Sequence, residues 1–65
     1  MTYPNVKELP RTGDYVVSLE DGATGQVVQT GNIDGKLTCR VLWEEGEHYG
    51  EQTNVEVGLL EVVRA

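Results

Sequence analysis

The sequence holds little of what secreted domains, membrane proteins and many enzymes use. Its 65 residues include one cysteine, one histidine, no phenylalanine and two prolines. A lone cysteine cannot form an internal disulfide and favours a reducing compartment. No apolar run is long enough to cross a bilayer, and the N-terminus lacks the apolar core of a signal peptide. We therefore expect a cytoplasmic protein with no membrane insertion.

Basic residues are also scarce. Five Lys and Arg residues stand against eleven Asp and Glu residues, for a formal net charge of -6. After Trp43 the only cation is Arg64, whereas the carboxylates there are Glu44, Glu45, Glu47, Glu51, Glu56 and Glu61. Such a surface repels phosphate backbones, so no direct nucleic-acid binding is expected. It favours a basic protein surface as partner, although the same charge can serve solubility alone.

Apolar and polar residues alternate along several segments with the two-residue period of β-strands. The clearest run predicts a strand over 37–43, and its core-facing side chains are expected to be Leu37, Cys39, Val41 and Trp43. Shorter runs predict further strands over 14–19, 25–30, 53–57 and 61–64. A short 3₁₀ turn is expected over 58–60. No window supports a helix, because glycines interrupt every stretch of helical spacing.

Turns and loops separate these strands. Asp21-Gly22 predicts a hairpin turn, because glycine tolerates the positive φ that such turns need. Residues 31–35 are predicted to form a loop, and 44–51 a solvated acidic loop. Residues 1–12 are predicted to form an extended N-terminal arm, and 13–65 a single β-barrel domain. The opening hairpin over 13–28 carries no catalytic group and is expected to supply no site.

The order of these signals resembles the SH3-like barrel superfamily. The residues that carry the resemblance are Gly13-Asp14, Asp21-Gly22, Gly25-x-Val27, Val41-x-Trp43 and Leu60-x-Val62. The resemblance implies an all-β, five-stranded SH3-like barrel with a 3₁₀ turn before the last strand. It is specific for the fold and weak for function, because this architecture hosts many unrelated tasks.

Four groups within this class resemble parts of the chain. Bacterial KOW-type modules share the glycine-centred first hairpin, but they usually carry basic residues that are missing here. The photosystem I subunit IV family resembles segments 37–41, 53–54 and 60–63, although that family is usually richer in basic residues. The plasmid-encoded trimethoprim-resistant dihydrofolate reductases are SH3-like chains of comparable length, but segment 52–55 does not reproduce their active-site strand. The CarS antirepressors resemble segment 22–28 and the acidic C-terminal half.

The two residues best suited to catalysis or metal binding, His48 and Cys39, are expected to have structural roles. His48 lies among acidic residues, but zinc sites use paired and closely spaced Cys or His ligands, and this chain has one of each. Cys39 is expected to be a small buried hydrophobe, because a reactive thiolate needs cationic neighbours. We therefore predict no catalytic residue, no metal site and no cofactor.

Binding is the function that remains, and it is predicted at the acidic half. Trp43 is expected to cap the core or, as the alternative, to form an aromatic binding platform with Tyr49 and Tyr15. The predicted partner-binding residues are Trp43, Glu44, Glu45, Glu47, Tyr49 and Glu51. The sequence thus favours a non-enzymatic interaction module that binds a basic partner, with an antirepressor or DNA-mimic regulator as one concrete form.

Two other classes stay open at this stage. One is a structural accessory subunit of a redox or photosynthetic complex, which the likeness to photosystem I subunit IV implies. The other is a small oligomeric enzyme whose site lies at a subunit junction, because a domain of this size has no room for a deep cavity of its own.

Overall fold

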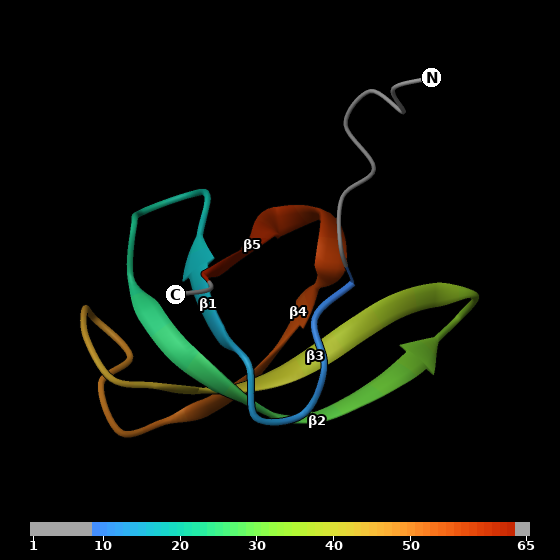
Figure 1. The fold of residues 1–65 in the computed structure, drawn as a ribbon, viewed down its shortest axis with the longest axis horizontal. Coiled ribbons are helices and arrows are strands. Elements are labelled where there is room, and N and C mark those ends of the chain that lie inside the picture. Colours follow the sequence, from blue (N-terminus) through green and yellow to red (C-terminus); the bar gives the residue numbers. More distant parts are fainter. Residues whose placement is uncertain (1–8, 64–65) are drawn as a thin grey trace.

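The computed structural model describes residues 9–63, which form one curved antiparallel sheet (Figure 1). Its elements are β1 (Tyr15–Ser18), β2 (Thr24–Ile33), β3 (Lys36–Trp43), β4 (Gln52–Glu56), the 3₁₀ turn η1 (Val57–Leu59) and β5 (Leu60–Val63). The strands lie in the order β4-β3-β2-β1-β5. The predicted all-β architecture of five strands, with a 3₁₀ turn before the last one, is confirmed. Residues 1–8 of the predicted arm lie outside the described residues.

Six side chains from four strands form the core. They are Val16, Val27, Cys39, Val41, Trp43 and Leu60. Three of the four residues predicted to face inward from β3 are among them. The prediction for Leu37 is wrong, because its side chain is 49% exposed. Leu37 pairs with Asn32 near the end of a hairpin that extends beyond the core, so alternation continues there with nothing to pack against.

The hairpin of β2 and β3 is longer than the sequence predicts. Residues 31–33 were expected in a loop, but β2 runs to Ile33 and pairs there with Lys36. The connection is only Asp34 and Gly35, with φ of 52° and 81°. Two-residue hairpin turns of type I′ need positive φ at both positions, which an Asp-Gly pair tolerates. Backbone pairing with β3 thus overrides the low strand preference of the glycine and asparagine in this segment.

A bulge divides the hairpin into a buried and an exposed part. The pairing register shifts between Val27 and Gln29, so Val28 is the extra residue on β2. Before the bulge, β2 contributes Val27 to the core, and from Val28 to Leu37 every residue is exposed. The core therefore lies under the first half of β2, and the second half projects from it (Figure 1).

Glycine is required at one buried position of β2. Gly25 pairs with Trp43 of β3. A Cβ at Gly25 would lie 2.6 Å from Val41 Cγ1 and 2.7 Å from the carbonyl oxygen of Leu42. The absence of a side chain there lets the two strands approach closely beside the indole, at the end of the sheet where the acidic loop begins.

Candidate functional site

Two loops that are distant in the sequence pack together at one end of the sheet. They are the β1–β2 turn, residues 19–23, and the β3–β4 loop, residues 44–51 (Figure 1). The Glu44 N–H donates to the Thr24 carbonyl oxygen at 2.9 Å, and the Thr24 hydroxyl donates to Glu45 Oε1 at 2.6 Å. A Cβ built on Gly46 would lie 3.0 Å from the Cβ of Ala23. The two loops therefore form one continuous surface.

This surface, which we call the acidic end, gathers carboxylates from both loops. Its members are Glu20, Asp21, Glu44, Glu45, Glu47 and Glu51, and all are exposed. The Lys and Arg residues in the part of the chain that the structure describes lie elsewhere. Lys36 pairs with Glu56 at 3.4 Å, Arg40 bonds to Asn54, and Arg11 lies before β1 at its opposite end from the β1–β2 turn. The acidic end therefore carries an uncompensated negative charge.

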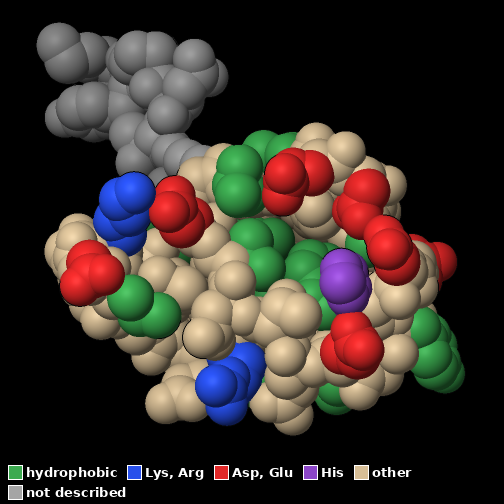
Figure 2. All heavy atoms as spheres, turned by 180° about the vertical axis from the view of Figure 1, so that it is seen from behind, with side chains coloured by type: hydrophobic (Ala, Val, Ile, Leu, Met, Phe, Trp, Pro, Cys, Tyr) green, Lys and Arg blue, Asp and Glu red, His purple; other side chains and the backbone are tan. Residues whose placement is uncertain are grey.

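His48 lies close to carboxylates of both loops, namely Glu47 and Glu51 of its own loop and Asp21 of the β1–β2 turn. Its Nδ1 is 2.9 Å from Glu51 Oε1, and this hydrogen bond raises the pKa of His48, with the charges of Glu51, Glu47 and Asp21 adding to it. The pKa of Asp21 is lowered, chiefly because the Ala23 N–H donates to its carboxylate. Figure 2 shows the histidine with hydrophobic side chains beside it and acidic side chains around it.

A pocket of about 200 Å³ opens beside His48, and we call it the Trp43–His48 pocket. Its lining comes from both loops and from β1, β3 and β4: Ser18, Glu20, Asp21, Ala23, Trp43, His48, Thr53 and Val55. The side chain of Trp43 is only 5% exposed, and its Nε1–H donates to Thr53 Oγ1 at 2.7 Å. Trp43 is thus a core residue that also lines this pocket, and it is not an open platform.

A second hollow, of about 400 Å³, lies on the other part of the acidic loop. It is lined by Leu42, Trp43, Glu44, Tyr49 and Gly50. Tyr49 is 74% exposed, and the Gly50 N–H donates to the Trp43 carbonyl oxygen at 2.9 Å. The backbone of β3 and its loop therefore brings three of the predicted binding residues together here.

The six predicted binding residues are divided by the fold. Trp43, Glu44 and Tyr49 share the second hollow, whereas Glu45 turns to Thr24 of β2. Glu51 bonds to His48, and Glu47 is close enough to influence the charge of that histidine. They occupy one end of the molecule without forming a single cluster.

Glu20 and Asp21 were missed by sequence reasoning. They belong to the opening hairpin, which was expected to supply no site, and both line the Trp43–His48 pocket. The turn itself was recognised from Asp21-Gly22. What the sequence did not give is the strand order, and it is the antiparallel run of β1, β2 and β3 that places this turn beside the β3–β4 loop.

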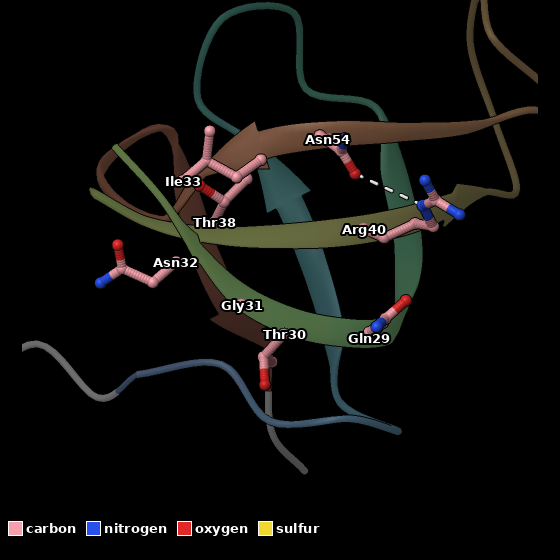
Figure 3. Close-up of a pocket in the computed structure, with 8 residues that line it drawn as sticks. All are labelled: Gln29, Thr30, Gly31, Asn32, Ile33, Thr38, Arg40 and Asn54. Atoms are coloured by element: carbon pink, nitrogen blue, oxygen red, sulfur yellow. Dashed lines mark hydrogen bonds between the residues drawn. The ribbon is translucent and has the colours of Figure 1, made fainter. Parts of the chain in front are cut away.

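A further hollow, of about 220 Å³, lies on the projecting hairpin and β4 (Figure 3). Its lining is mostly uncharged and polar: Gln29, Thr30, Gly31, Asn32, Ile33, Thr38, Arg40 and Asn54. Its single charged side chain, Arg40, has Nε 3.4 Å from Asn54 Oδ1. With neither a carboxylate nor a histidine in its lining, this hollow offers hydrogen bonds and no acid–base pair.

Other chemistry-bearing groups are set apart. Cys39 is fully buried, and desolvation raises the pKa of its thiol, which keeps it neutral. Within residues 9–63, no three His, Cys, Asp or Glu side chains are grouped so that they could hold a metal ion. The same residues include no helix that is both long and apolar enough for a membrane span.

The acidic end thus offers exposed carboxylates beside two hollows, a combination suited to contact with cations. Comparison of the chain with protein-family models, with curated proteins and with solved structures gave no match.

Proposed function

We propose that this protein is a non-enzymatic interaction module whose acidic end binds a basic surface of a partner protein. The observation that carries the proposal is the convergence of two acidic loops, joined by the Thr24–Glu45 hydrogen bond and the contact between Ala23 and Gly46. Loops that served only solubility would not need to gather their charge on one surface, away from the described Lys and Arg residues.

Electrostatics describes how such a surface would act. Carboxylates concentrated at one end produce a directed field that speeds encounter with a basic partner and orients it. A DNA-binding surface is one basic surface of this kind, because it is built to neutralise phosphates. An antirepressor or DNA mimic, in which carboxylates occupy the positions of phosphates, is the concrete form that we favour.

The test compares two double variants that remove the same charge from different places. Glu44→Gln with Glu47→Gln removes two of the six carboxylate charges of the acidic end, and Asp34→Asn with Glu61→Gln removes one charge from the hairpin turn and one from β5. Binding of a labelled decamer of alternating lysine and serine is measured by fluorescence anisotropy at low and at physiological salt. Because exposed ion pairs are each worth about 0.2–1 kcal/mol, the first variant should weaken binding about twofold to thirtyfold.

The second double variant is the control, and it should change the affinity less than the first at each salt concentration. Binding to the wild-type chain should also weaken as salt is added, since the charges are exposed. If the peptide does not bind, or if both variants weaken binding equally, the acidic end is not the binding surface and the proposal is wrong.

A further inference from the structure

The Trp43–His48 pocket combines an apolar floor with carboxylates from the β1–β2 turn. Ala23, Val55 and the indole of Trp43 line it, and Glu20 and Asp21 stand at the same pocket. The floor belongs to the packed body of the domain, because Ala23 and Val55 are in contact with the core to which Trp43 belongs. Such a pocket is held by strands as well as by loops.

The polar groups of the pocket are largely satisfied within the protein. The Trp43 Nε1–H already donates to Thr53 Oγ1, and the Glu20 N–H is 3.3 Å from the Ser18 hydroxyl oxygen. Among the described residues, every buried side-chain nitrogen and oxygen has a hydrogen-bond partner. Over residues 9–63, no buried side-chain donor is therefore free to bind an anion or a neutral polar ligand. The groups that can contact a ligand are exposed carboxylates and apolar surface.

The size of the pocket points to a side chain. Its volume of about 200 Å³ lies below the range of about 300–1,000 Å³ that is usual for sites of drug-sized ligands. It is larger than the roughly 30 Å³ that one water molecule occupies. An apolar floor beside carboxylates matches the two parts of a lysine or arginine side chain, whose alkyl stem packs on apolar surface while its charged end stays near water.

We propose that the Trp43–His48 pocket receives one lysine or arginine side chain of a partner protein. The alkyl stem would lie against Val55, Ala23 and the indole, and the cation would lie between the carboxylates of Glu20 and Asp21. This inference rests on the proposed function and sharpens it, because it assigns one anchoring contact within a broad charged surface.

His48 makes such binding depend on pH. It lines the pocket, so its protonated form adds a positive charge beside the incoming cation. The charges that act on it are Glu51 and Glu47 from its own loop and Asp21 from the β1–β2 turn. Together these three carboxylates favour the protonated form of His48, whereas a bound cation should disfavour that form. Affinity should therefore rise as the pH passes upward through the pKa of His48.

The test uses a pentapeptide with a single lysine, Gly-Gly-Lys-Gly-Gly with both ends blocked, and a matched peptide in which norleucine replaces the lysine. Each is titrated into the ¹⁵N-labelled full chain, and the indole N–H signal of Trp43, the only tryptophan, reports on the pocket. The lysine peptide should shift this signal to saturation, and the norleucine peptide should not. The affinity should be higher above the pKa of His48 than below it.

Two variants locate the contact. Glu20→Gln with Asp21→Asn removes both charges and keeps an oxygen that can accept the Ala23 N–H, so the turn is retained. It should weaken binding of the lysine peptide about twofold to thirtyfold. Asp34→Asn with Glu61→Gln removes the same charge elsewhere and should have the smaller effect.

The outcomes separate this inference from the proposed function. One outcome is that the lysine decamer binds through Glu44 and Glu47 while the single-lysine peptide does not shift the Trp43 signal, or binds with the same affinity to the Glu20 and Asp21 variant. In that case the pocket assignment is wrong and the proposed function stands. If the single-lysine peptide binds as expected, but the affinity of the decamer is unchanged by the Glu44 and Glu47 variant, the pocket assignment stands and the proposed broader binding surface is wrong. If neither peptide binds, both fail.

Discussion

Replacing Gly25 with alanine should destabilise the protein through a clash in its core. The added Cβ would lie 2.6 Å from Val41 Cγ1 and 2.7 Å from the Leu42 carbonyl oxygen. Overpacking typically costs about 1–3 kcal/mol, and the backbone oxygen cannot rotate away, which places Gly25→Ala in the upper part of that range. Alanine recovers about 0.5–1 kcal/mol relative to glycine in a strand. The net loss should therefore be about 2 kcal/mol.

That loss is large for a chain of this length. At about 0.05–0.15 kcal/mol per residue, the whole domain is stabilised by about 3–10 kcal/mol. A net loss of this size should lower the Tm by about 8–16 °C. The assay is urea and thermal unfolding, followed by the fluorescence of Trp43, which is buried in the folded state.

Gly31 provides a matched control in the same strand. A Cβ at this position meets no atom within 4 Å, and its φ is outside the left-handed region. Gly31→Ala should therefore leave stability unchanged or raise it by up to about 1 kcal/mol. If Gly25→Ala proves as stable as Gly31→Ala, the close approach of β2 and β3 at Gly25 is not what the structure describes, and the reasoning is refuted.

Three further predictions concern the hydrogen bond of the indole, the histidine and the thiol. Thr53→Val leaves the Trp43 Nε1–H without its acceptor and should cost about 1–3 kcal/mol in urea unfolding, whereas Thr53→Ser should retain most of the stability. NMR titration should give His48 a pKa above its ordinary value, and Glu51→Gln should lower it. This raised pKa contributes stability that is full below the pKa of the unfolded chain and is lost as the pH rises through the folded value; Glu51→Gln should flatten that dependence. The buried Cys39 should resist a thiol reagent in the folded protein and react after unfolding, and rapid reaction under native conditions would contradict its burial.

The fold was largely predictable because its signals are local. Alternation in β3 identified Cys39, Val41 and Trp43 as core residues, and Asp21-Gly22 marked the first turn. The wrong predictions arise because a local sequence pattern does not show how far the core extends. Leu37 continues the alternation past the point where anything covers it, and β2 extends beyond its expected end because β3 offers backbone partners.

The candidate site was less predictable, because it depends on which loops become neighbours. The acidic loop after Trp43 is visible in the sequence, and its exposure is as expected. That Glu20 and Asp21 join it follows from strand order and from the contact between Ala23 and Gly46, neither of which has a local signature. Membership of the SH3-like superfamily stays a prediction.

The projecting part of the β2–β3 hairpin has a consequence for how the sequence can vary. From Val28 to Leu37 no residue is buried, so this segment is held by backbone pairing and the exposed Lys36–Glu56 ion pair rather than by burial in the core. Removing or adding two residues on each strand, next to the Asp34-Gly35 turn, would keep the turn and the alternation of hydrogen-bonded and non-hydrogen-bonded pairs while leaving the core intact. The hairpin is therefore where natural relatives should differ most in length, and where a foreign peptide could be inserted at little cost to the stability of the core.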